Sequence, residues 1–100
     1  MEKDSEITEL LQWLRQQLGD SFVVTDHWDG DLCAVGISSP SDPNQLVYVL
    51  SFGRPPGRYA VELESAPVAG SDFRSVVGKF DLLSREELLA KVKEHLQIAK

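Results

Sequence analysis

Apolar residues recur every three or four positions at both ends of the chain, a pattern that predicts two amphipathic helices. The first is predicted over about residues 6–18, with Asp4 or Ser5 as its N-terminal cap. The second is predicted to follow Ser84, because Ser84 and Glu87 have the spacing of a capping box. The apolar stripes of the two helices are Ile7, Leu10, Leu11, Leu14 and Leu18, and Leu88, Leu89, Val92, Leu96 and Ala99.

Between the helices, apolar and polar residues alternate with a period of two, which predicts β-strands. The Asp29-Gly30 pair is a favoured two-residue hairpin turn, and it would place Val24 opposite Val35 and Asp26 opposite Cys33. The strands are predicted over residues 21–28, 31–37, 46–52, 58–64 and 73–77, with 76–82 as the alternative for the last.

This order of elements predicts a single α+β domain over residues 1–100. Short links favour a two-layer sandwich, in which an antiparallel meander of four to five strands carries the N- and C-terminal helices on one face. The other face stays open and is expected to be lined by Val23, Thr25, Leu32, Ala34, Val47, Val49 and Ala60, with His27, Glu62 and Glu64 at its edge. Such a half-apolar face is suited to docking another chain.

Composition places the chain among ordinary globular proteins, with 42% hydrophobic and 26% charged residues. The charged start lacks the apolar stretch of a secretory signal, and the lone Cys33 suits a reducing compartment. We therefore expect a cytoplasmic protein. No apolar run approaches the roughly 20 residues of a membrane-spanning helix, so no membrane association is expected.

The net charge of −6 is concentrated near the start of the chain. Residues 1–31 contain eight of the 16 acidic residues but only two of the ten basic ones. Nucleic-acid binding needs a basic stripe to neutralise phosphates, and the sequence contains none. An acidic pole instead favours attraction to a basic protein partner.

Asp26 is the candidate for catalysis, because alternation places it on the apolar face with Asp31 as its diagonal neighbour. A desolvated carboxylate beside another has a raised pKa, as a general acid requires. With His27, the pair would support a hydrolase-type enzyme. Solvation at the hairpin tip is the simpler interpretation. No metal is predicted, because His27 points to the opposite face from both acids, and no motif predicts a cofactor.

Arg54 and Arg58 flank a stiff turn that contains two consecutive prolines. Two guanidinium groups at such a turn suit a phosphate or a carboxylate. The segment lacks the lysine, the Ser/Thr and the following helix of a phosphate-binding loop. A rigid hairpin turn with solvated arginines is therefore the favoured interpretation.

Taken together, the patterns predict a non-enzymatic protein-interaction module: an adaptor, a secretion-chaperone-like protein, or an inhibitor or immunity-type protein. The acidic pole, the open sheet face and the lack of a catalytic constellation favour this class. The alternatives are the hydrolase-type enzyme and a self-associating structural domain that forms a homodimer through the open face. The expected partner-binding residues are His27, Asp29, Asp31, Val47, Val49, Arg54, Arg58, Glu62 and Glu64.

Overall fold

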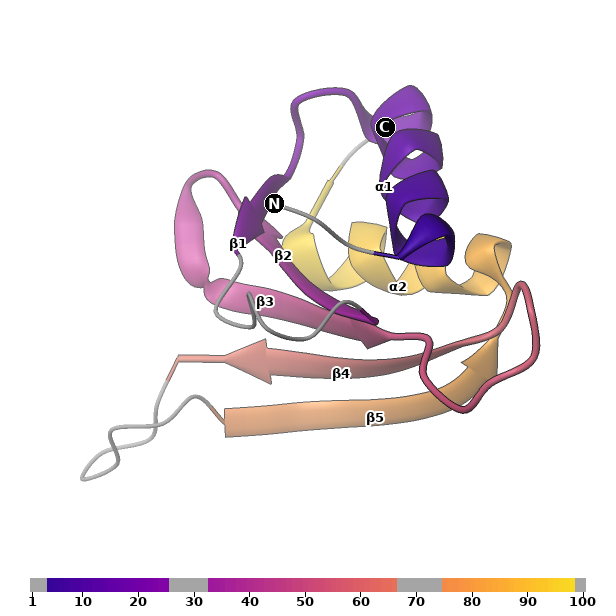
Figure 1. Cartoon of the computed structure of the whole chain (residues 1–100). Helices are drawn as coiled ribbons and strands as arrows, with labels where there is room; N and C mark the ends of the chain where they lie inside the picture. Colours follow the sequence, from indigo (N-terminus) through magenta and orange to yellow (C-terminus); the bar gives the residue numbers. More distant parts are fainter. Residues whose placement is uncertain (1–3, 26–32, 67–74, 99–100) are drawn as a thin grey trace.

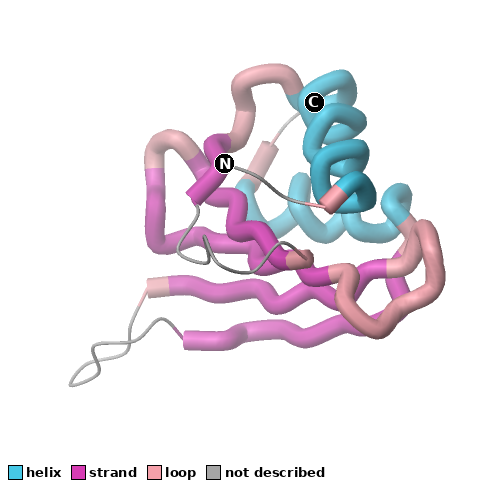
Figure 2. Tube along the Cα trace, viewed as in Figure 1, coloured by secondary structure: helices cyan, strands magenta, loops and turns pink. Residues whose placement is uncertain are grey.

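The computed structural model of the protein describes residues 4–25, 33–66 and 75–98. Five consecutive antiparallel strands form one meander sheet, in the order β1-β2-β3-β4-β5, between an N-terminal and a C-terminal helix (Figure 1). The elements are α1 (Ser5–Leu18), β1 (Val23–Thr25), β2 (Ala34–Ser39), β3 (Asp42–Leu50), β4 (Tyr59–Ser65), β5 (Ser75–Leu83) and α2 (Arg85–Leu96). Both helices lie on the same side of the sheet (Figure 2), which confirms the predicted two-layer α+β sandwich.

Both helices begin at the caps that the sequence predicts. The Asp4 carboxylate accepts a hydrogen bond from the backbone N–H of Ile7 at 2.9 Å, so Asp4 is the N-cap of α1. At α2, the Ser84 hydroxyl accepts from the Glu87 backbone N–H at 3.2 Å, and the Glu87 carboxylate accepts from the Ser84 N–H at 2.9 Å. This reciprocal pair is a complete capping box, which satisfies two backbone donors that a helix start leaves unpaired.

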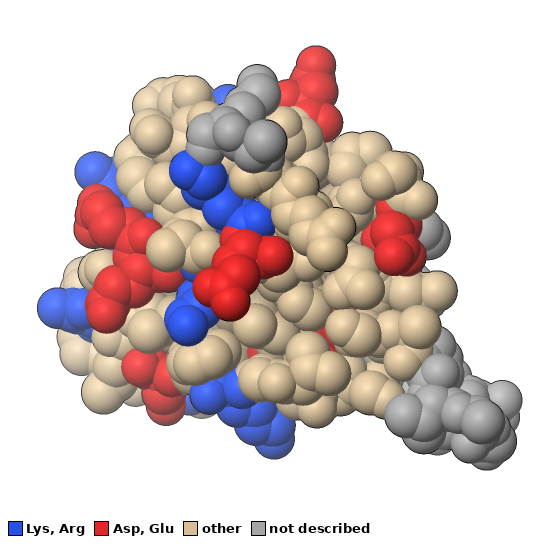
Figure 3. All heavy atoms as spheres, turned by 180° about the vertical axis from the view of Figure 1, so that it is seen from behind, with Lys and Arg blue, Asp and Glu red and all other residues tan. Residues whose placement is uncertain are grey.

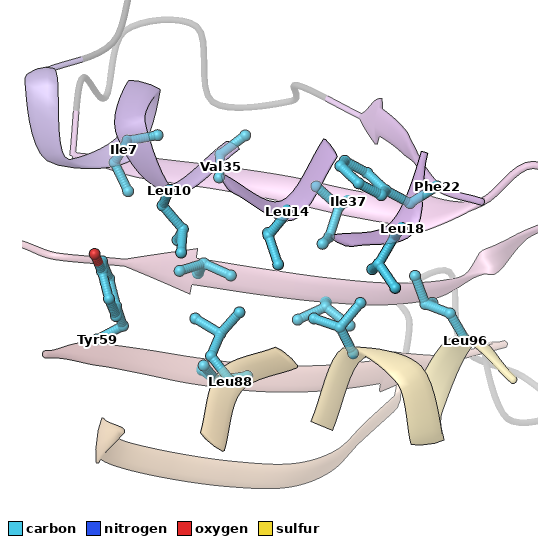
Figure 4. Packing of buried hydrophobic residues seen from close by; sticks show 14 residues of the cluster. Ile7, Leu10, Leu14, Leu18, Phe22, Val35, Ile37, Tyr59, Leu88 and Leu96 are labelled. Carbon is cyan, nitrogen blue, oxygen red and sulfur yellow. The ribbon is translucent and has the colours of Figure 1, made fainter. Parts of the chain in front are cut away.

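The hydrophobic core fills the space between the two helices and one face of the sheet (Figure 4). The helices contribute their predicted apolar stripes, except that Leu11 and Leu89 are only partly buried and Ala99 lies outside the described residues. The buried cluster consists of Ile7, Leu10, Leu14, Leu18, Phe22, Val35, Ile37, Val47, Val49, Tyr59, Val61, Leu88, Val92 and Leu96.

The prediction for the faces of β3 is wrong. Val47 and Val49 were expected on the open face, but both are buried under the helices, at 0% and 1% exposed. The ladder explains this placement: Val49 pairs with Val35 on one side and with Val61 on the other, so all three share the helix-covered face. The larger side chains of β3, those of Leu46, Tyr48 and Leu50, therefore point to the other face.

The register of the first hairpin also differs from the prediction. Val24 pairs with Ile37 rather than with Val35. Because side chains alternate with a period of two, this two-residue shift leaves Val24, Val35 and Ile37 on their expected face. Phe22 accordingly lies in the core with Val35 and Ile37. The predicted Asp29-Gly30 turn and the pairing of Asp26 with Cys33 lie outside the described residues.

The bounds of β3 and β5 also differ from the sequence expectation. β3 begins at Asp42, four residues before its predicted start at residue 46. β5 spans Ser75–Leu83, which confirms the alternative placement over 76–82.

The reversed face of β3 can be tested by placing a charge on it. We expect Val49→Lys to lower the free energy of unfolding by more than about 3 kcal/mol, because it buries an unpaired ammonium group. Val77→Lys is the matched control: Val77 is 60% exposed, so the change should stay within about 0.5 kcal/mol. Urea denaturation measures both. Equal stability of the two variants would contradict the assignment of Val49 to the core.

Candidate functional site

The starts of both helices and the turn between β3 and β4 meet at one end of the molecule (Figure 1). They enclose a hollow of about 410 Å³. α1 begins there because Asp4 caps it, and the same carboxylate accepts a hydrogen bond from the Cys33 thiol at 3.1 Å, next to the start of β2. The hollow is lined by Glu6, Glu9, Leu10, Pro56, Gly57, Tyr59, Ser84, Arg85 and Glu86.

Of the acids of this hollow, Glu6 and Glu86 occupy the first turns of the two helices, where negative side chains are favoured by the helix dipole, and Glu9 follows in the next turn of α1. Glu6 and Glu9 form no ion pair with any residue that the structure describes. Arg85 is already engaged, because it contacts Glu86 at 3.1 Å and lies over the Trp13 ring at 4.6 Å. The hollow therefore has an excess of negative charge.

Tyr59 forms the inner wall of the hollow. Tyr59 is 6% exposed. Its ring lies at one end of the row of core side chains, with the hydroxyl oxygen at the tip of the ring (Figure 4). The hydroxyl makes no hydrogen bond within residues 4–25, 33–66 and 75–98. The Tyr59 hydroxyl thus provides an unused donor and acceptor beside the carboxylates.

Burial raises the pKa of Tyr59 above its ordinary value, and the negative charge of Glu6 raises it further. Tyr59 therefore stays protonated at neutral pH and serves as a hydrogen-bonding group rather than as a base. Carboxylates and a neutral hydroxyl are the partners that an ammonium or guanidinium group requires. The groups that line the hollow are thus chemically suited to bind a cation.

Arg54 and Arg58, the candidate anion clamp, each contact groups of the protein itself. Arg54 binds both oxygens of Asp81, through Nε at 2.9 Å and Nη2 at 3.1 Å. This contact raises the pKa of Arg54 and lowers that of Asp81. Arg58 donates to the Leu82 carbonyl oxygen at 3.4 Å and lies 3.6 Å from the Glu87 carboxylate. The structure thus favours a role for both arginines in fixing the turn.

The remaining predicted site residues do not converge on one place. Glu62 and Glu64 are half-buried on the face away from the helices. In the ladder between β4 and β5, Glu62 is the residue opposite Lys79. Val47 and Val49 lie on the opposite face, in the core. The positions of His27, Asp29 and Asp31, and of Asp26 in the enzyme alternative, lie outside the described residues.

A second hollow, of about 440 Å³, lies at the opposite end of α2 and is lined mainly by polar groups. His95 borders it and is hydrogen-bonded through Nε2 to the Glu64 carbonyl at 2.7 Å. In the described part of the chain, no serine hydroxyl is hydrogen-bonded to His95. The described residues also contain no group of three His, Cys, Asp or Glu side chains able to hold a metal ion.

On the back of the molecule, Lys and Arg side chains alternate with Asp and Glu side chains over one half of the visible face (Figure 3). They are not gathered there into a basic stripe of the kind that binds phosphates. Of the helices in the described segments, none has the length and apolarity to cross a membrane.

Comparison with known proteins gives no match: no protein-family model, no curated protein and no solved structure is significantly similar to this chain. The site is therefore defined by its own residues alone.

Sequence reasoning missed the four residues that define the hollow: Glu6, Glu9, Tyr59 and Glu86. The sequence does predict acids at both helix starts, as helix caps and dipole partners. Their convergence on Tyr59 depends on the packing of both helix starts at the same end of the sheet. No spacing within the sequence encodes this contact.

The electrostatic contact in the hollow predicts how Tyr59 titrates. We expect Tyr59 to ionise above its ordinary pKa of about 10, and Glu6→Gln to lower that pKa while burial keeps it raised. Because the folded protein disfavours the phenolate, stability should fall as the pH rises from about 10, the pKa of an unfolded tyrosine, to the raised pKa of Tyr59. NMR spectra of ring-labelled tyrosine separate Tyr59 from Tyr48, the other tyrosine. An unchanged pKa in Glu6→Gln would show that Glu6 does not face the hydroxyl.

Proposed function

We propose that the protein is a protein-interaction module that binds a basic partner, with a lysine or arginine side chain of the partner held in the hollow between the starts of α1 and α2. The observation that carries this proposal is the buried Tyr59 hydroxyl, which has no partner among the described residues and faces an excess of carboxylates. A cation would supply the missing hydrogen bond and offset the charge.

The charge distribution of the whole chain supports the same partner. The net charge is −6, and the excess of acids falls in the first third, which includes Glu6 and Glu9. Such a pole attracts a basic partner over a screening length of about 8–10 Å at physiological salt. The protein then acts as an adaptor or as an inhibitor that covers a basic surface. Its proposed setting is the cytoplasm, where a lone Cys33 stays reduced.

No observation favours the two alternatives to the same degree. The hydrolase-type enzyme rests on Asp26, His27 and Asp31, which lie outside the described residues. The open face proposed for self-association lacks Val47 and Val49, because both lie under the helices. The side chains of β3 that replace them there are not exposed: Leu46 is buried, and Tyr48 and Leu50 are half-buried.

A labelled peptide in which lysine and serine alternate tests the proposal. Wild type should bind it, and the double variant Glu6→Gln/Glu9→Gln should bind about tenfold more weakly, since charge pairs at an interface contribute on this scale. Affinity is measured by fluorescence anisotropy at low and physiological salt.

The matched control is Asp20→Asn/Glu94→Gln, which removes the same charge from two exposed residues away from the hollow. We expect its affinity to stay close to that of wild type. If both double variants lose affinity equally, net charge alone attracts the peptide and the hollow is not the site. If wild type does not bind, the proposed function is wrong.

A further inference from the structure

Among the described residues that line the hollow, Arg85 is the only basic one. It is the first residue of α2 and directly follows the Ser84 cap. Its side chain is 52% exposed, so the guanidinium group remains in contact with solvent. The free protein therefore already holds one cation at the wall of the hollow.

The position of Arg85 in α2 is electrostatically unfavourable. The start of a helix carries a partial positive charge, which favours acidic side chains in the first turn and disfavours basic ones. Glu86 and Glu87 follow this rule, and Arg85 does not. Residues that break such a local rule are found mainly at functional or strained sites. The stability of α2 alone therefore does not account for an arginine at this position.

Within the described residues, the Arg85 guanidinium makes two electrostatic contacts. Its Nε donates a hydrogen bond to Glu86 Oε2 at 3.1 Å, and its central carbon lies 4.6 Å from the centre of the Trp13 ring in α1. Both kinds of contact are weak where solvent reaches the cation. Arg85 is thus held by contacts that allow another cation to replace it.

The charge of Arg85 also acts on Tyr59. Burial is the main cause of the raised pKa of Tyr59, and Glu6 raises this pKa further, whereas the positive charge of Arg85 lowers it. At the hydroxyl, Arg85 therefore offsets part of the negative potential of the carboxylates. The same negative potential attracts the cation of a partner. A charge that weakens the potential also weakens this attraction.

A purely structural role is the alternative for Arg85, because its contact with Trp13 connects the start of α2 to α1. The helix dipole argues against this role, since an uncharged side chain of similar length would cover the ring without opposing the dipole. The two roles also differ in their consequences. A structural residue affects stability when it is changed, whereas a competing charge affects the affinity of the hollow.

We infer that Arg85 is an internal competitor for the hollow: in the free protein it binds Glu86, and the lysine or arginine side chain of the partner has to displace it from this carboxylate. This inference rests on the proposed function and adds to it how the affinity of the hollow is limited. Arg85 is thus a specificity-determining residue, because it admits only a cation that binds the carboxylates better than Arg85 itself does.

The variant Arg85→Gln tests the inference with the labelled lysine–serine peptide. Glutamine keeps a polar side chain at residue 85 and removes its charge. We expect the variant to bind the peptide about fivefold more tightly than wild type, because a like charge next to the bound cation is removed. Fluorescence anisotropy measures the affinity, and the gain should be smaller at physiological salt than at low salt, because salt screens exposed charges.

Two control variants separate the position of the charge from its amount. Lys79→Gln also removes one positive charge, from an exposed residue that lies opposite Glu62 in the ladder and does not line the hollow. Arg85→Lys keeps the positive charge at residue 85. We expect both controls to bind the peptide about as tightly as wild type.

A second measurement needs no peptide. In Arg85→Gln, NMR spectra of ring-labelled tyrosine should show Tyr59 ionising at a higher pKa than in wild type, because the charge that lowers this pKa is gone. An unchanged pKa would show that the Arg85 charge does not reach the hydroxyl, and it would overturn the inference.

The outcomes distinguish this inference from the proposed function. If wild type binds the peptide and Arg85→Gln binds it equally or more weakly, Arg85 is not a competitor, and the cation site stays in place. If Lys79→Gln gains as much affinity as Arg85→Gln, net charge explains the gain and the inference is wrong. If neither wild type nor Arg85→Gln binds, the proposed function is wrong as well.

Discussion

The rest of the described structure depends on the packing of both helices against a row of three valines in the middle of the sheet. Val35, Val49 and Val61 are direct neighbours in β2, β3 and β4, and each is 1% exposed. This row forms the floor on which both helices pack. The starts of α1 and α2 reach the same end of the sheet, and the acidic hollow forms where they meet.

Two features that commonly stabilise proteins, acidic residues near helix starts and a buried aromatic ring, lie next to each other in the hollow. Acids in the first turn of a helix normally complement the helix dipole and are solvated. Here Glu6, Glu9 and Glu86 surround a tyrosine whose ring belongs to the core. Burial of Tyr59 secures the end of the core, while its hydroxyl remains unpaired within the described residues. A cationic side chain of a partner would supply the hydrogen bond that the described residues do not provide to this hydroxyl.

Local signals in the sequence predicted much of the fold. The helix bounds and the capping box depend on contacts within one turn, so spacing alone reveals them. The faces of β3 could not be predicted in this way, because Leu46, Val47, Tyr48, Val49 and Leu50 are apolar in both phases of the strand. The prediction placed the larger side chains, those of Leu46, Tyr48 and Leu50, on the helix-covered face, which is the wrong phase. Pairing with Val35 and Val61 determines the right one.

The candidate site was less predictable than the fold, since it joins residues from four separate elements. The charge distribution pointed to the first third of the chain and to a basic partner. It did not point to Tyr59, whose alternation pattern is that of an ordinary core residue. The sequence suggests Arg54 as part of an anion clamp, whereas the structure pairs it with Asp81. These contacts depend on long-range packing.

The most direct test of this account compares folding and binding in Tyr59→Phe. Tyr59→Phe removes a hydroxyl that has no hydrogen-bond partner among the described residues, so the free energy of unfolding should change by less than about 1 kcal/mol. The same variant should bind the lysine–serine peptide more weakly, because the cation loses a hydrogen-bonding partner. Urea denaturation and fluorescence anisotropy measure the two effects. A variant that is less stable yet binds the peptide as well as wild type would contradict the account, since Tyr59 would then serve the fold alone.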